Sequence, residues 1–174
     1  MDLRKHLTGR NLKWNWDAIC AYLIEHPSKI PDLIGHCLDE ETIVQQNAGA
    51  VLGKIIDHDK KVLVPFQMEL TEMLNKELHD AVHRAIMRIF QLIEISEEVE
   101  GYLYDAVIRF LNKAEAPIAV KAFGMTVGRR ICEKYPELAQ ELYPIVETLV
   151  EQKLSTGIVA RGKSELKLLS ALMA

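Results

Sequence analysis

A pair of residues recurs along the chain at a nearly constant interval: a small residue preceded by a polar or basic one. The pairs are Asn47-Ala48, Arg84-Ala85, Lys121-Ala122 and Arg161-Gly162. Four leucines on the segments between these pairs recur at nearly the same interval; they are Leu38, Leu74, Leu111 and Leu149. Two independent columns with one period indicate a chain of repeated units, each of which buries its apolar face against its neighbours.

Within each unit the apolar residues follow a helical period. One segment has apolar residues at steps of three and four positions, namely Val44, Ala48, Val51, Leu52, Ile55 and Ile56. This spacing is typical of an amphipathic helix. No segment alternates with period two, and aromatic residues make up only 6% of the 174 residues, so a β-sandwich or barrel is disfavoured. We expect an all-α fold, a right-handed α-α superhelix of about nine helices without a sheet.

Short polar or proline-containing breaks divide the chain into a half unit at 15–25 and four helix pairs. The expected first helices cover 29–38, 62–76, 98–113 and 137–152. The expected second helices cover 41–57, 79–95, 116–134 and 156–172. We expect one domain over 1–174, with a cap and half unit at 1–27 and helix-pair units at 28–58, 62–95, 98–134 and 137–173.

Small residues on the second helices predict close contact between helices. We expect the alanines of the first column to be buried at such contacts; they are Ala48, Ala85 and Ala122. Two glycine pairs, Gly49 with Gly53 and Gly124 with Gly128, are each separated by about one helical turn. A glycine inside a helix costs about 1 kcal/mol relative to alanine, so we interpret both pairs as sites of close helix approach.

A small residue with a basic neighbour early in each second helix resembles the HEAT repeat, over residues from about 28 to 173. HEAT units usually carry an Asp a few residues before the basic residue, and only Asp80 with Arg84 fits this pattern here. Ile43 and Pro117 occupy the equivalent places in the neighbouring units. The resemblance implies an α-solenoid whose second helices line a concave surface for a partner.

The layout of short helices and the run Val120-Lys121-Ala122-Phe123-Gly124-Met125-Thr126 are similar to a group of small bacterial HEAT-like proteins that often carry the name adenylosuccinate lyase. That name implies a mobile loop of the type Ser-Ser-x-Met-Pro-x-Lys-x-Asn, and this chain has no Ser-Ser pair. We therefore interpret the name as a mis-transfer. We expect a non-enzymatic scaffold or adaptor without catalytic residues or cofactors.

Basic residues gather on the expected second helices toward the C-terminus. The candidate binding residues are Arg84, Arg88, Lys121, Arg161 and Lys163. Pro117 and Gly157 stand where Lys121 and Arg161 would need a ladder acid, so we expect both charges to face a concave groove and to bind an acidic segment of another protein. A net charge of −4 disfavours a polyanion. A nucleic-acid-binding or DNA-glycosylase-like HEAT protein remains the alternative.

Other candidate sites have weaker patterns. His79 and His83 share one helix face, at a spacing that suits Zn²⁺, but no third ligand lies nearby in sequence, so we expect no structural zinc. We expect Asp57-His58-Asp59 to be a solvated connection. His36-Cys37 resembles a Cys/His pair for nucleophilic chemistry, and we expect Cys37 to be a buried, inert thiol.

The remaining features concern location and the N-terminal end of the repeats. Three cysteines without a C-x-x-C motif, together with the absence of an apolar signal-peptide core, predict a cytoplasmic protein with reduced thiols. We expect Trp14 and Trp16 to cover the open N-terminal end of the solenoid, with a partner-anchoring role as the alternative.

Overall fold

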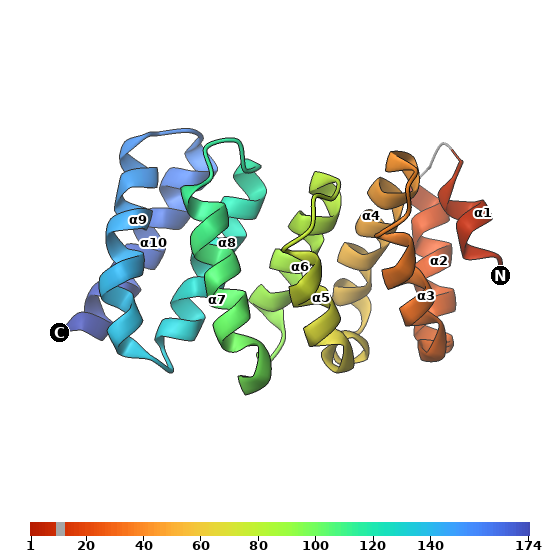
Figure 1. Cartoon of the computed structure of the whole chain (residues 1–174), viewed down its shortest axis with the longest axis horizontal. Coiled ribbons are helices and arrows are strands. Elements are labelled where there is room, and N and C mark those ends of the chain that lie inside the picture. Colours follow the sequence, from red (N-terminus) through yellow and green to blue (C-terminus); the bar gives the residue numbers. More distant parts are fainter. Residues whose placement is uncertain (10–12) are drawn as a thin grey trace. The chain divides into compact units, whose positions relative to one another are not determined.

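The chain is almost entirely helical. A computed structural model describes residues 1–9 and 13–174, without the side chains of Lys13 and Trp14. Over these residues it contains ten α-helices, three short 3₁₀ helices and no strand (Figure 1). The expected all-α class is therefore confirmed, and one helix more than the nine expected is present. The chain divides into two compact units, Met1–Ile95 and Ser96–Ala174, whose boundary falls between two expected helix pairs; the single-domain organisation stays a prediction.

The first unit holds the N-terminal cap and two helix pairs. The cap consists of α1 (Leu3–Leu7) and α2 (Lys13–Glu25), of which α1 is the helix that the sequence pattern did not predict. The first pair is α3 (Ile30–His36), preceded by the 3₁₀ helix η1 (Pro27–Lys29), and α4 (Thr42–His58). The second pair is α5 (Gln67–Met73), preceded by η2 (Lys61–Phe66), and α6 (Asp80–Leu92).

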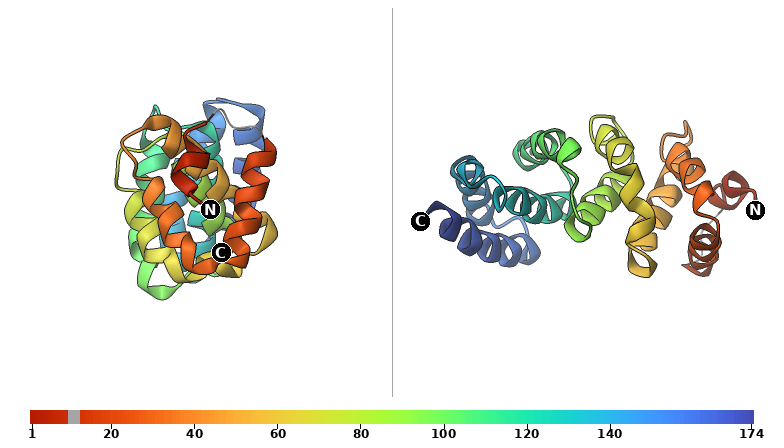
Figure 2. Two further views of the ribbon diagram at one scale, coloured as in Figure 1. Left: turned by 90° about the vertical axis from the view of Figure 1, so that its right-hand side faces the viewer. Right: turned by 90° about the horizontal axis from the view of Figure 1, so that it is seen from below.

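The second unit holds two further pairs. These are α7 (Glu97–Asn112) with α8 (Ile118–Cys132), and α9 (Ala139–Glu151) with α10 (Thr156–Met173), and η3 (Pro136–Leu138) precedes α9. Within this unit α7 and α9 form one layer and α8 and α10 the other, as the view from below shows (Figure 2, right).

Prolines explain why two helices begin later than expected. Pro65 lies in η2, and the α-helix of that pair begins only at Gln67, because proline has no N–H to donate within an α-helix. Pro117 has ψ 141° and is the residue before α8, which therefore begins at Ile118 rather than at 116.

The second helices begin at equal intervals along the chain. Their first residues are Thr42, Asp80, Ile118 and Thr156. The third residue of each helix is branched and fully buried, at Val44, Val82, Val120 and Ile158. The alanines proposed as a column from the sequence recur at an interval one residue shorter than that of the second helices, so they are the seventh, sixth and fifth residues of α4, α6 and α8 and are out of register. Ala48 and Ala85 are buried as expected, but Ala122 is only partly buried.

Glycines permit close helix contacts in each unit. A Cβ on Gly49 of α4 would lie 2.8 Å from the backbone of Ala81 and Val82 in α6. In the second unit, a Cβ on Gly128 would lie 2.9 Å from Leu142 of α9. Both observations confirm the interpretation of Gly49 and Gly128 as sites of close approach.

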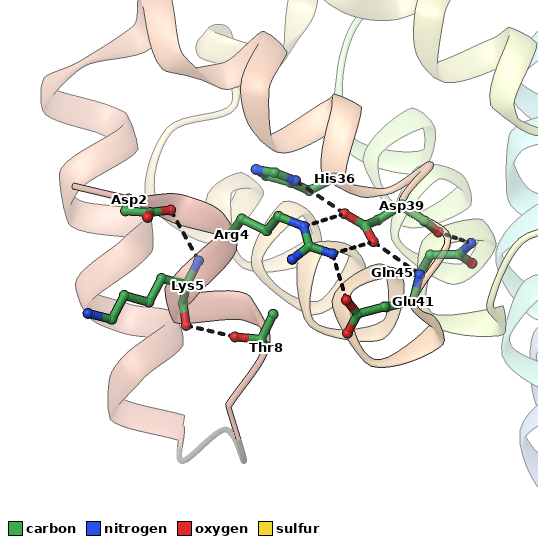
Figure 3. A network of polar contacts seen from close by, with 8 residues as sticks. All are labelled: Asp2, Arg4, Lys5, Thr8, His36, Asp39, Glu41 and Gln45. Carbon is green, nitrogen blue, oxygen red and sulfur yellow. Dashed lines mark hydrogen bonds and ion pairs between the residues drawn. The ribbon is translucent and has the colours of Figure 1, made fainter.

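The helix α1 is held by polar contacts to the first pair. Arg4 donates from Nε to Asp39 Oδ2 at 3.0 Å and from Nη2 to Glu41 Oε1 at 2.7 Å (Figure 3). The hydrogen bond from Arg4 holds the pKa of Asp39 below its usual range. The buried side chain of Asn47 donates to the Leu7 carbonyl at 2.7 Å. These contacts fix α1 against the start of α4.

Gly49→Ala tests the close contact of α4 with α6. We expect this variant to lower the free energy of unfolding by about 1–3 kcal/mol, because the new methyl group displaces backbone rather than a mobile side chain. Gly53→Ala is the control on the same helix, because its Cβ would meet Ala85 at an ordinary 3.4 Å. Urea denaturation measures both variants, and equal midpoints would contradict the proposed contact.

Candidate protein-binding surface

The basic residues selected from the sequence do not share one position in the repeat. Arg84, Lys121 and Arg161 are the fifth, fourth and sixth residues of α6, α8 and α10. Successive residues of a helix are rotated by about 100°, so the three side chains leave their helices in different directions. The expectation that the column points one way is therefore wrong, because its intervals are unequal whereas the second helices begin at equal intervals.

Arg84 and Arg88 lie one turn apart on α6 but differ in their contacts. Arg84 is exposed, and in the described part of the chain no ion pair joins it to Asp80. Arg88 donates from Nη1 to the Gly53 carbonyl at 2.6 Å and pairs from Nη2 with Asp57 Oδ1 at 2.5 Å. The hydrogen bond from Arg88 lowers the pKa of Asp57. Arg88 thus joins α6 to α4, whereas Arg84 is displayed to solvent.

Lys121 is not on the surface. The residue is 2% exposed, and Nζ donates to the Ala114 carbonyl at a long 3.4 Å. The expectation that its charge is displayed on a groove is wrong, because the fourth residue of α8 faces the preceding loop. The fourth residues of α6 and α4 make the same kind of contact. His83 donates from Nε2 to the Lys76 carbonyl at 3.0 Å, and Gln45 donates to the Asp39 carbonyl at 2.7 Å.

Arg161 belongs to a polar network between α8 and α10. It donates to Thr126 Oγ1 at 2.7 Å, and Thr126 donates to Glu165 Oε1 at 2.5 Å. Glu165, 4% exposed, also accepts from Arg129 Nε at 2.9 Å. Arg161 therefore has a partner that the ladder pattern did not predict. Lys163 is exposed and leaves α10 from a different side than Arg161, because residues two apart on a helix do not face each other.

The two helix layers of the second unit carry opposite net charge. The helices α8 and α10 carry six basic residues, Lys121, Arg129, Arg130, Arg161, Lys163 and Lys167, and one acidic residue, the buried Glu165. The helices α7 and α9 carry one basic residue, Arg109, and seven acidic ones, Glu97, Glu98, Glu100, Asp105, Glu141, Glu147 and Glu151. We call α8 and α10 with their side chains the basic layer.

The basic layer also displays large apolar side chains. Ile118 on α8 is 46% exposed and Leu168 on α10 is 44% exposed. Arg130 on α8 is partly buried, and its pKa is lowered first by this burial and then by the charge of Arg129. A surface that combines cations with apolar side chains offers both of the contacts that a protein segment makes at an interface.

Residues of the histidine and acidic motifs form hydrogen bonds with backbone groups nearby in sequence. His79 precedes α6 and its Nδ1 accepts from the Ala81 N–H at 3.1 Å, while His83 is bonded to Lys76. Within the described ranges no group of three or more His, Cys, Asp or Glu residues is placed to hold a metal ion, and the expectation of no zinc stays a prediction. Asp59 accepts from the Lys61 N–H at 2.8 Å, as in a turn.

The cysteines are buried thiols. Burial raises the pKa of Cys20 and Cys37 to about 12 and that of Cys132 to about 11. A thiol of such high pKa is protonated at neutral pH and is a poor nucleophile. The interpretation of Cys37 as a buried residue is confirmed.

The expectation that Trp14 and Trp16 cover the N-terminal end of the solenoid stays a prediction. Trp16 is partly buried on α2. The side chain of Trp14 lies outside the described residues.

Arg88→Gln tests whether Arg88 is engaged with Asp57 within the protein. We expect the pKa of Asp57 to rise toward the ordinary value of a carboxyl group, because the hydrogen bond from Arg88 is the main cause of its lowering. The intact pair stabilises the folded protein at neutral pH, and this contribution is lost as the pH falls through the lowered pKa of Asp57. NMR titration of side-chain carboxyl carbons measures the change. Arg84→Gln is the matched control, and an equal change in both variants would refute the assignment.

Glu165→Gln tests the network between α8 and α10. We expect the free energy of unfolding to fall by about 1–3 kcal/mol, because the largely buried Arg129 loses the buried one of its two carboxylate partners. Glu133→Gln removes the second carboxylate bonded to Arg129, but this side chain is 54% exposed, so we expect a loss of only about 0–1 kcal/mol. Chemical denaturation compares the two, and a larger effect at Glu133 would show that the network is misassigned.

Comparison with known proteins adds the family. A family model described as a HEAT repeat domain matches residues 3–168. No curated protein and no solved structure matches the chain. None of the helices in the described part of the chain combines the length and the apolar character that crossing a membrane needs. The match covers nearly the whole chain and agrees with helix pairs that recur at a constant interval, so this chain belongs to the HEAT repeat family.

Proposed function

We propose that this protein is a non-enzymatic adaptor that binds an acidic segment of a partner protein on the basic layer of its second unit. The observation that carries the proposal is the separation of charge between α8 with α10 and α7 with α9. Helical repeat proteins use extended surfaces of this kind for binding. Six of the seven acidic residues of the opposite layer are exposed, all except Glu100, and they repel an acidic segment, so the charge pattern favours one face.

The exposed cations of α10 are the residues that we assign to this contact. Lys163 and Lys167 are exposed and lie one turn apart on α10, whereas Arg161 leaves the helix from another side and is engaged with Thr126. Arg84 is exposed on the first unit and is proposed as a separate contact. Arg88 is bonded to Gly53 and Asp57, and Lys121 is buried beside the loop before α8, so neither is assigned to this surface contact.

The exposed apolar residues favour a protein over a nucleic acid. Ile118 and Leu168 provide anchors that a phosphate backbone does not use. A chain of net charge −4 also repels a polyanion at long range. The three cysteines are free thiols, which is compatible with the cytoplasmic location that we propose.

Selection from a displayed random peptide library tests the proposal. We expect the enriched peptides to carry a net negative charge together with apolar residues. Lys163→Glu with Lys167→Glu is expected to weaken binding of a selected peptide by at least about tenfold. Lys60→Glu with Lys61→Glu is the matched control, since it makes the same change of charge on exposed lysines of the first unit, and we expect it to leave the affinity nearly unchanged.

Two outcomes would contradict the proposal. The first is enrichment of neutral or basic peptides, or an equal loss of affinity in both double variants. The second is tight binding of duplex DNA, with an affinity that falls steeply with salt and is lost in the Lys163/Lys167 variant. That result would establish the nucleic-acid alternative.

A further inference from the structure

The ends of α7 and α9 border a pocket that contains a buried cation. The pocket has a volume of about 400 Å³ and lies between the last turn of α7, the second half of α9 and the start of α8. Leu111 and Leu149 form part of its apolar wall, and Asn112 and Gln152 contribute amide groups. Lys121 lines the same pocket, and no carboxylate does so among the described residues.

The ammonium group of Lys121 has fewer partners than a buried cation requires. An ammonium carries three N–H donors, and the described residues give Lys121 one long bond, to the Ala114 carbonyl at 3.4 Å, and no ion pair. A buried charge is costly unless it is paired and hydrogen-bonded. The pocket is therefore next to a cation that lacks an anion.

The equivalent positions in the other pairs show that closing the loop does not need a lysine. Gln45 and His83 make shorter bonds to the loops before their helices, at 2.7 and 3.0 Å. In the last pair the apolar residue Val159 stands at this position. The loop before that helix contains Lys153, which has a left-handed φ of 50°. The positive charge at Lys121 is thus not explained by its contact with Ala114.

We infer that this pocket binds a single carboxylate carried on a small apolar group, with Lys121 as its counter-ion. The carboxylate supplies the missing acceptor for the ammonium, and the leucines cover the apolar part. A volume of about 400 Å³ is within the range of small-molecule sites. The acidic residues of α7 and α9 make a doubly charged phosphate a poorer ligand than a carboxylate with one charge.

Two sources have this chemistry, a free small acid and the C-terminal carboxylate of a peptide. The test uses isotopically labelled leucine methyl groups observed by NMR. The free-acid arm compares 3-phenylpropanoate with its primary amide, and the peptide arm compares a short peptide ending in a free leucine carboxylate with its amidated form. Inorganic phosphate is the third probe.

We expect at least one acid to shift the methyl signals of Leu111 and Leu149, and its amide to bind at least about tenfold more weakly. Shifts with 3-phenylpropanoate alone indicate a small metabolite-like acid, and shifts with the peptide alone indicate a chain terminus. Failure of both acids at millimolar concentration, equal binding of acid and amide, or tighter binding of phosphate would overturn the inference.

Lys121→Gln separates the charge from the loop contact. The glutamine reproduces the donor that Gln45 provides in the first pair, so we expect the fold to be kept and the affinity for the acid to fall by at least about tenfold. Lys113→Gln is the control, because Lys113 is an exposed lysine at the end of α7 and does not line the pocket. Unchanged affinity in Lys121→Gln would refute the role of Lys121. The comparison of acid with amide needs no variant and remains decisive if Lys121→Gln does not fold.

Discussion

The packing of each second helix against its neighbour is the constraint on which the rest of the structure depends. A single amphipathic helix exposes its apolar stripe, and within each unit α4 with α6 and α8 with α10 cover each other's stripes. The fully buried third residues of these helices, Val44, Val82, Val120 and Ile158, fix the rotation of each helix about its axis. Once this rotation is fixed, every other side chain on the helix has a set direction. The repeat therefore decides which charges are buried and which are exposed, before any partner is considered.

The sequence predicted the helices well because apolar spacing and breaks are local signals. It predicted the candidate site poorly, because the basic residues were selected as neighbours of small residues. A small residue can occupy several positions around a helix, so it does not define which way its neighbour points. Val44, Val82 and Val120 are equally spaced along the chain, and this regular column of branched residues was the better signal. The role of Glu165 was not predictable from local sequence, because its partners Thr126 and Arg129 lie far away in the chain on another helix.

Counting basic residues overestimates the charge that a repeat protein offers to a partner. Arg88 is bonded to Gly53 and Asp57, and Arg129 is bonded to Glu133 and Glu165. These bonds join neighbouring helices or turns, so the same residues contribute to the arrangement of the helices rather than to a free surface. The binding surface proposed on α8 and α10 therefore rests on Lys163 and Lys167, which are exposed, and on the burial of the acid that these helices carry.

The fourth residues of the second helices differ in how well they bond to the loop before their helix. In the first pair Gln45 accepts the His79 N–H at 2.8 Å while it donates to Asp39, so one amide satisfies two loops. In the second pair the imidazole of His83 satisfies one carbonyl. Lys121 satisfies its carbonyl less well than either and adds a buried charge. Natural sequences depart from the local rules of their fold mainly at functional positions. A buried lysine with one long hydrogen bond is such a departure, and a ligand in the adjacent pocket accounts for it.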